Sequence, residues 1–160
     1  MIRPVQPSDV AEICEIYNHY VDKTVVTFEE EPVAPSEMSE RIEQLTPSLP
    51  WLVSEVDGAV YGYAYAAPYR SRSAYKFTVE TTLYLAPERT GQGLGTELYR
   101  ALLKQLRERK LHCALAGIAL PNPASVALSE KFGFRKVGEL KEVGWKQGRW
   151  VDVGYWELIL

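Results

Sequence analysis

The stretch that decides the fold reads Leu83-Tyr84-Leu85-Ala86-Pro87-Glu88-Arg89-Thr90-Gly91-Gln92-Gly93-Leu94-Gly95-Thr96. An apolar strand ends here, glycines follow at alternate positions, and a helix begins whose leucines recur every four residues. Glycine lets a backbone approach a ligand closely, and the unpaired first amides of a helix attract an anion. The pattern therefore predicts a phosphate or pyrophosphate cradle over residues 91–96. A tight turn that only caps the helix is the alternative.

Two better-known phosphate loops do not fit this stretch. A dinucleotide-binding loop needs G-x-G-x-x-G and an acidic residue about 20 positions later, after the next strand. The chain has G-x-G-x-G instead, and the strand expected over residues 111–120 ends without an acidic residue. A P-loop needs a Gly-Lys-Ser/Thr sequence, and residues 91–96 contain no lysine. These comparisons exclude both loop types.

The elements around the loop predict one mixed α/β (α+β) domain over residues 1–160. Alternation, apolar runs and turn residues such as Asp57-Gly58 indicate strands at 2–4, 51–56, 59–67, 77–85, 111–120, 134–143 and 151–160. Helical spacing and capping residues indicate helices at about 8–20, 36–45, 95–109 and 124–132. Residues 24–28 are also β-branched and aromatic, which suits a strand, but the Glu29-Glu30-Glu31-Pro32 sequence ends any such element. We expect a mostly antiparallel central sheet of six to seven strands, flanked by about four helices, with one parallel βαβ unit.

Composition and charge exclude several classes of protein. The chain has 160 residues, 46% hydrophobic and 24% charged, and a net charge of −3, so it lacks the basic face of a general nucleic-acid binder. Cys14 and Cys113 lie far apart and form neither a metal-ligand spacing nor a redox pair. We expect reduced thiols, no metal site, no secretory signal and a cytoplasmic location. The uncharged stretch 111–129 is interrupted by Pro121-Asn122-Pro123, which argues against a membrane span.

Several motifs together resemble one enzyme family. Residues 89–99, Arg-Thr-Gly-Gln-Gly-Leu-Gly-Thr-Glu-Leu-Tyr, resemble the acyl-CoA loop of the GNAT acetyltransferases. Asn-Pro-Ala-Ser at 122–125 and Glu-Lys-Phe-Gly-Phe at 130–134 resemble that superfamily's second signature. Gly-Trp-Lys-Gln-Gly-Arg-Trp-Val-Asp-Val-Gly-Tyr-Trp at 144–156 is similar to the phosphinothricin N-acetyltransferase branch, as are residues 50–53 and 67–75. The resemblance spans nearly the whole chain. It implies a GNAT-like fold and acetyl-CoA as co-substrate.

The resemblance also implies the residues that bind acetyl-CoA. Backbone amides of the loop would hold the pyrophosphate, and this role falls on Gly91, Gln92, Gly93, Leu94, Gly95 and Thr96. The preceding strand residues Leu83, Tyr84 and Leu85 would pair with the pantetheine arm, and Asn122 would lie near CoA. Two positions depart from the family pattern. Thr90 stands where the superfamily has Gln or Arg, and Ser129 stands where many relatives have a tyrosine that protonates the CoA thiolate. Solvent or another group must then supply that proton.

Glu80 is the candidate base. In the strand over 77–85, side chains alternate, and Glu80 is the only acid on the face that it shares with Thr78, Thr82 and Tyr84. An ammonium must lose a proton before it attacks a thioester, and a carboxylate accepts that proton better if burial raises its pKa. A solvated or salt-bridged strand glutamate is the alternative. The phosphinothricin branch, which this chain resembles, has its catalytic glutamate here. Val151 replaces a histidine of that branch, so Glu80 would act alone or through water.

The substrate residues are predicted on a short polar loop. Arginine binds a carboxylate or phosphinate with two hydrogen bonds, which makes Arg70 and Arg72 candidates, together with Tyr75. An exposed basic loop is the alternative. We expect Arg72 to contribute more than Arg70, because it lies nearer in sequence to Tyr75 and to the strand that bears Glu80. The resemblance assigns this loop to an acidic amino-acid substrate. It also places Phe28 in the region that lines the substrate pocket, although ordinary core packing would explain Phe28 equally well.

The activity implied by the resemblance is N-acetylation. Acetyl would pass from acetyl-CoA to the α-amine of a small amino acid or analogue, such as phosphinothricin or methionine sulfoximine. The amine would attack directly, since no nucleophile motif such as G-x-S-x-G is present. A protein N-terminal acetyltransferase, which would need an open groove, and an inactive CoA-binding or sensing module remain alternatives. The resemblance further suggests a homodimer, in which Trp145, Trp150 and Trp156 would belong to the interface or the core.

Overall fold

One seven-stranded sheet runs through the computed structural model, which describes residues 1–160. The strands are β1 (Ile2–Pro4), β2 (Trp51–Val56), β3 (Ala59–Pro68), β4 (Thr78–Leu85), β5 (Cys113–Leu120), β6 (Arg135–Lys146) and β7 (Arg149–Ile159). The helices are α1 (Val10–Lys23), α2 (Pro35–Leu45), α3 (Leu94–Glu108) and α4 (Pro123–Lys131). The strand order is β1-β2-β3-β4-β5-β7-β6, and only β4 and β5 are parallel. The predicted mixed sheet with one parallel βαβ unit is confirmed.

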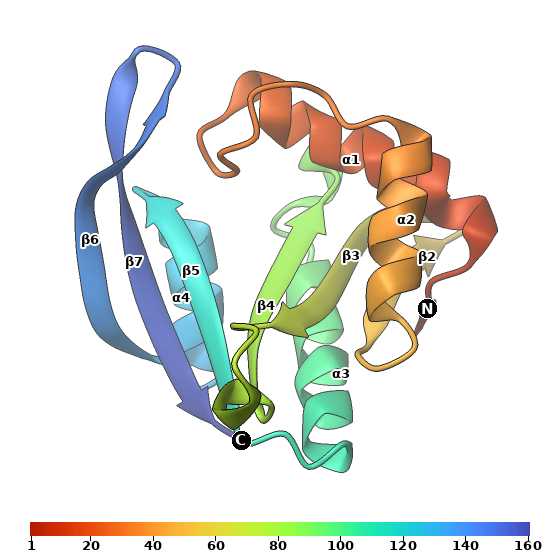
Figure 1. Ribbon diagram of the computed structural model, residues 1–160. Helices are drawn as coiled ribbons and strands as arrows, with labels where there is room; N and C mark the ends of the chain where they lie inside the picture. Colours follow the sequence, from red (N-terminus) through yellow and green to blue (C-terminus); the bar gives the residue numbers. More distant parts are fainter.

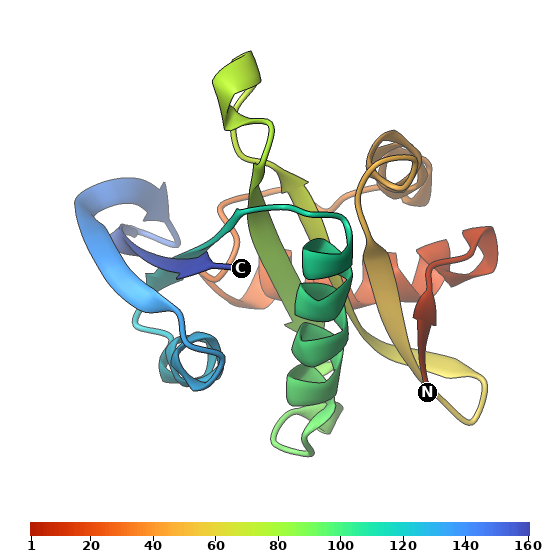
Figure 2. The same ribbon diagram turned by 90° about the horizontal axis from the view of Figure 1, so that it is seen from below.

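Helices cover both faces of the sheet and give the protein two cores (Figures 1 and 2). On one face, the leucine stripe Leu98, Leu102 and Leu106 of α3 is fully buried. On the other face, α1 and α2 pack Ile13 and Met38 against the sheet. The alternation expected in β4 is confirmed, because Val79 belongs to the first core and Tyr84 packs against the second. Glu80 therefore faces the side of α1 and α2.

The segment 24–28 is not a strand but part of the loop between α1 and α2. Its polar atoms are used locally. The Thr24 hydroxyl donates to the carbonyl of Tyr20 and accepts from the amide of Val26, and the amide of Glu29 donates to the hydroxyl of Thr27 at 3.4 Å. These turns compete with strand geometry, so β-branched composition alone does not produce a strand here. The loop forms one wall of the site instead.

Strands β4 and β5 pair over only three positions and then diverge. The pairs are Thr78 with Cys113, Val79 with Ala114, and Glu80 with Leu115. Beyond Glu80, β4 keeps a strand partner on the β3 side alone. Figure 1 shows the two strands opening into a V. This opening places a gap in the middle of the sheet, at the end of the strand that leads into the glycine loop.

Strands β6 and β7 form a hairpin that reaches past the other strands (Figure 1). Their two-residue turn is Gln147-Gly148, with φ values of 52° and 73°, the left-handed geometry that suits a tight hairpin. The strands extend further toward this turn than the sequence predicts, and β6 lies at the edge of the sheet. Among the helices, none combines the length and the apolar character that crossing a membrane requires.

Candidate active site

A cavity of about 550 Å³ lies at the glycine loop, between the end of β4 and helix α4. Its lining includes most of the residues expected to bind acetyl-CoA, namely Leu83, Tyr84, Leu85, Gly91, Gly93, Gly95, Thr96 and Asn122. Gln92 and Leu94 belong to the same loop but do not line the cavity. The structure therefore brings the loop, the strand and the second signature together around one space.

The glycines of this loop adopt a backbone that other residues rarely take. Gly91 and Gly93 have φ values of 75° and 87°, and Gly93 is the residue from which α3 begins. A Cβ built on either glycine would meet nothing within 4 Å. Their requirement for glycine is thus conformational, not a matter of crowding by neighbouring protein atoms. As at the start of any helix, the first amides of α3 have no intrahelical partners, and the open glycine turns leave room beside them for an anion.

The cation at this cavity comes from a residue that the sequence analysis did not single out. Arg89 is the charged residue next to Thr90, the position that differs from the family pattern. Its guanidinium stacks on the ring of Tyr61 at 4.2 Å. Lys131 of α4 lines the cavity, and its Nζ lies 3.4 Å from the Thr96 hydroxyl. Lys131 belongs to the Glu-Lys-Phe-Gly-Phe stretch, so the sequence motif already contained this cation. That its side chain points toward the glycine loop follows from the packing of α4.

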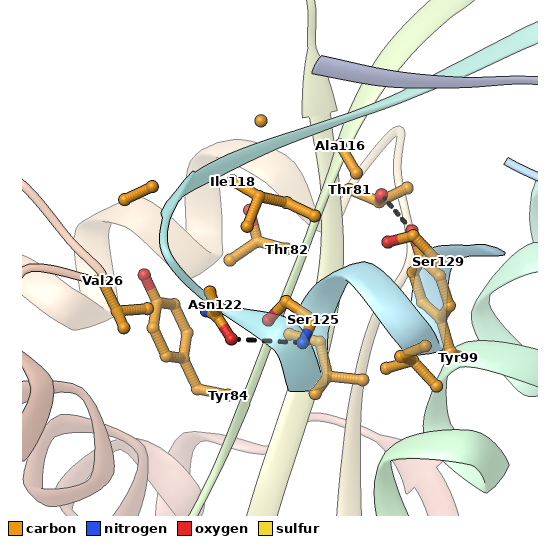
Figure 3. A pocket seen from close by; sticks show the side chains of 14 residues that line it. Val26, Thr81, Thr82, Tyr84, Tyr99, Ala116, Ile118, Asn122, Ser125 and Ser129 are labelled. Atoms are coloured by element: carbon orange, nitrogen blue, oxygen red, sulfur yellow. Dashed lines mark hydrogen bonds between the residues drawn. The ribbon is translucent and has the colours of Figure 1, made fainter. Parts of the chain in front are cut away.

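A smaller cavity of about 120 Å³ fills the gap between β4 and β5 (Figure 3). At one side the Asn122 side chain caps α4 by accepting from the amide of Ser125 at 3.2 Å. At the other side the hydroxyls of Thr81 and Tyr99 are 2.8 Å apart, with Ser129 beside them. This cavity shares lining residues with the loop cavity, including Leu83, Tyr84 and Asn122. It also shares Thr82, Tyr84 and Gly117 with a cavity on the opposite side of the sheet, so it lies between the two.

On that opposite side lies a third cavity, of about 400 Å³, which contains Glu80 and Phe28. Its floor is formed by β4 and β5, one wall by residues 26–28, and the other wall by β6 and β7. Glu80 is half-buried, and its carboxylate makes no hydrogen bond within the chain. Burial raises the pKa of its carboxyl, and the nearby Arg70 acts in the opposite direction. A carboxylate with these surroundings is available to accept a proton.

The ring of Phe28 is seated against the hairpin. A Cβ added at Gly144 of β6 would overlap this ring. The ring is nonetheless 41% exposed, so it is a wall of the cavity more than a core residue. Val151, which stands where the resembling branch has a histidine, is buried against Val25 and Ala119. It brings no titratable group to Glu80.

The two candidate arginines differ in their surroundings. The Arg70 guanidinium lies 5.0 Å from the ring centre of Tyr69 and 5.9 Å from that of Tyr75. Both arginines are exposed, and neither lines these cavities, so the difference between them lies in these ring contacts. Both arginines contact Tyr75: the Arg70 guanidinium lies beside its ring, and the Arg72 carbonyl accepts from its amide at 3.0 Å. Tyr75 itself lines an adjoining cavity that shares Tyr155 with the one around Glu80.

Comparison with known proteins places these features in context. The model of the acetyltransferase (GNAT) domain matches residues 2–154. The phosphinothricin N-acetyltransferase of Streptomyces viridochromogenes is 43% identical over 156 residues, covering 98% of this chain and 85% of that protein. The L-methionine sulfoximine/L-methionine sulfone acetyltransferase of Salmonella typhimurium is 37% identical over 161 residues, covering 99% and 94%.

Two solved structures have nearly the same fold. A GNAT superfamily phosphinothricin acetyltransferase from Sinorhizobium meliloti, in complex with AcCoA, has a TM-score of 0.97 and 36% identity. The match covers 100% of this chain and 88% of that one. A ribosomal-protein-alanine N-acetyltransferase from Brucella melitensis has a TM-score of 0.98 and 35% identity, with coverage of 100% and 99%. The fold is thus shared by proteins whose names indicate different acceptors.

Proposed function

Because the chain belongs to the GNAT acetyltransferase family, we propose that it moves acetyl from acetyl-CoA to the α-amine of a small amino acid or analogue. Phosphinothricin and methionine sulfoximine are the first candidates, since enzymes for both are among its relatives. The observation that carries the proposal is a set of adjoining cavities that share lining residues. An anion-binding loop lies on one side of the gap between β4 and β5, and Glu80 lies on the other.

The residues around the loop fit acetyl-CoA, which supplies the thioester carbonyl. The free first amides of α3 and the ammonium of Lys131 suit its pyrophosphate. The edge of β4 beyond Glu80, which lacks a partner on the β5 side, suits the amides of the pantetheine arm. Leu83, Tyr84 and Leu85 then line its path toward the gap. In this arrangement Gln92 and Leu94 contribute backbone groups only.

Glu80 is the proposed base. Its carboxylate takes a proton from the substrate ammonium, directly or through one water. The neutral amine attacks the thioester carbonyl carbon, the C–S bond breaks as the amide forms, and the second proton that the nitrogen loses passes to solvent. Burial raises the pKa of Glu80 toward neutrality, which makes the carboxylate a stronger base than an exposed glutamate. Solvent or another group returns a proton to the thiolate.

The loop after β3 is proposed to bind the acidic groups of the substrate. Arg70 lies close enough to Glu80 to act on its pKa, so an anion bound there would lie near the amine that Glu80 deprotonates. Arg72 and Tyr75 are proposed to complete this part of the site, and Phe28 to cover the substrate. An amino acid with a second anionic group, as in phosphinothricin, matches such a set of charges.

The homodimer and the cytoplasmic location also remain proposals. Strand β6 is an edge strand that exposes apolar side chains, among them Val137, Val143 and Trp145. Such an edge favours contact with a second copy. Light scattering on the purified protein measures its mass directly and so tests the homodimer.

For the cytoplasmic location, the support is that both cysteines are free thiols, as expected in a reducing compartment.

Turnover on a panel of amines tests the function. Release of CoA thiol would be followed with phosphinothricin, methionine sulfoximine, unmodified amino acids and a peptide with N-terminal alanine. We expect saturable turnover with the small analogues and none with the peptide, because the Phe28 wall narrows the pocket. Preferential turnover of the peptide would support a protein N-terminal acetyltransferase. Tight binding of acetyl-CoA in calorimetry without turnover of any amine would support a CoA-binding module.

A further inference from the structure

Lys146, the last residue of β6, is a buried cation without a carboxylate partner. Its exposed fraction is 3%, and it takes part in none of the ion pairs of the chain. Burial lowers the pKa of its ammonium, while Glu30, Asp22 and Glu29 act in the opposite direction. A lysine in such a place is costly unless its donors are used. The hydrogen bond of Lys146 therefore indicates its role.

The hydrogen bond of Lys146 joins two distant segments. Its Nζ donates to the carbonyl of Thr27 at 2.8 Å, across 119 positions of sequence. The neighbouring Gln147 side chain donates to the carbonyls of Asp22 and Thr24, both at 3.4 Å. The tip of the β6–β7 hairpin is thus attached to the end of α1 and to the loop that follows it.

These two segments are the opposite walls of the cavity that contains Glu80. Residues 26–28 form one wall, and Leu140, Val143 and Val153 belong to the other. Thr27, the residue that Lys146 holds, is itself a lining residue, as are its neighbours Val26 and Phe28. The separation of the walls therefore depends on the bond between Lys146 and Thr27. The cavity around the glycine loop has no lining residue from the hairpin.

We propose that Lys146 is a positioning residue for the amine substrate: by holding the carbonyl of Thr27, it keeps the α1–α2 loop against the β6–β7 hairpin and sets the width of the amine pocket. The proposal rests on the proposed function, because it assigns this pocket to the amine. It predicts a larger effect on the amine than on acetyl-CoA, because Val26 is the one residue of the joined segments that also lines the cavity around the glycine loop.

Loss of the bond should loosen the wall without unfolding the chain. Val25 packs with Ala119 and Val151 beneath the same junction, so apolar contact between loop and hairpin would remain. If the closed wall is then present for only a fraction of the time, the apparent affinity for the amine falls by that fraction. A hydrogen bond from a charged donor is strong enough to change such a population about tenfold or more.

The test compares Lys146→Met, which keeps the length and removes the donor, with Lys146→Arg, which retains a donor. Lys104→Met is the matched control, because Lys104 is 76% exposed on α3 and the change removes the same charge. We expect Lys146→Met to raise the KM for the amine about tenfold or more. The KM for acetyl-CoA and the kcat at saturating amine should stay within about twofold. Lys146→Arg should recover most of the amine affinity, and Lys104→Met should match the wild type.

A second measurement needs no substrate. Hydrogen exchange of the amides in residues 24–28 should be faster in Lys146→Met than in the wild type and the Lys104→Met control. Unchanged exchange there overturns the inference whether or not any amine is acetylated. Equal rises in the KM of both substrates, or no rise in either, also overturn it. Absence of turnover in the wild type counts against the proposed function alone, because the exchange result stands independently.

If Lys146→Met proves unstable, Gln147→Asn tests the same junction from an exposed residue. Asparagine tolerates the left-handed backbone at this position, and its shorter side chain cannot reach both carbonyls. A smaller rise in the KM for the amine, again without a change for acetyl-CoA, is expected. An amine KM equal to that of the wild type in a stable Gln147→Asn protein would contradict the inference.

Discussion

Gly144 of β6 lies directly beneath the aromatic ring of Phe28, and no side-chain carbon could be added to it without displacing that ring. The two residues are 116 positions apart: Phe28 lines the pocket around Glu80, and Gly144 follows Val143, which lines the opposite wall. The absence of a side chain at 144 thus determines how closely the loop between α1 and α2 approaches the hairpin. A role in shaping the pocket accounts for this glycine better than turn formation does.

Gly144→Ala should therefore impair use of the amine. The Phe28 ring must move to admit the methyl group, and we expect the KM for the amine to rise several-fold while the KM for acetyl-CoA is unchanged. Gly138→Ala is the control, because a Cβ at this other β6 glycine meets nothing within 4 Å. Steady-state kinetics of both variants measure the effect. A normal amine KM in Gly144→Ala would show that the ring position does not matter to the substrate.

Glu80→Gln should lower kcat near pH 7 by about 10²–10⁴-fold, because glutamine keeps the shape but cannot accept the proton. Acetyl-CoA affinity should stay nearly constant. The loss should shrink at high pH, where more of the amine arrives already deprotonated. A folded Glu80→Gln enzyme with wild-type kcat and an unchanged pH profile would return Glu80 to a structural role.

The pH profile of the wild type carries a further prediction. Burial raises the pKa of Glu80, so activity should fall, as pH is lowered, at a higher pH than an ordinary glutamate would give. Below that pKa the carboxyl is protonated and cannot act as a base. Because Arg70 opposes the rise, Arg70→Ala should move the acid limb of kcat/KM to still higher pH. A shift in the other direction would be inconsistent with this arrangement.

The two arginines can be ranked by parallel substitution. Sequence order favours Arg72 as the main anchor of the acidic group, whereas the contacts with Tyr69 and Tyr75 favour Arg70. Arg70→Ala should raise the KM for the amine more than Arg72→Ala, and neither should change the KM for acetyl-CoA. A larger effect of Arg72→Ala would indicate that this exposed side chain reaches the substrate only in the bound state.

Gly93→Val should weaken binding of acetyl-CoA at the loop. A β-branched residue at a φ of 87° costs about 1–2 kcal/mol and would distort the turn from which α3 begins. Gly58→Val carries a similar strain at a φ of 82° in the β2–β3 turn, far from the loop in sequence, and serves as the control. Both should lower the melting temperature, but calorimetry should find weaker acetyl-CoA binding only in Gly93→Val. Wild-type affinity in a folded Gly93→Val protein would remove the loop from the cofactor site.

Sequence patterns predicted the elements because local physics determines them. Alternation placed Glu80 and Tyr84 on one face of β4 and Val79 on the other, and a spacing of four placed the α3 leucines in a core. Paired turn residues marked the hairpin at Asp57-Gly58, where both φ values are positive. Together with the order of the elements, these signals were sufficient for the mixed sheet and its single parallel pair.

Tertiary structure decided the shape of the site, since its walls come from segments that are far apart in the chain. No local pattern distinguishes residues 24–28, which form a wall, from a strand, and none shows that Lys146 is buried or that Gly144 must lack a side chain. The opening between β4 and β5 depends on where their pairing stops, which is a property of the packed sheet. The sequence therefore identified the candidate residues and the elements that carry them. Which of these residues meet depends on packing between distant segments, and no periodic pattern in the sequence reports it.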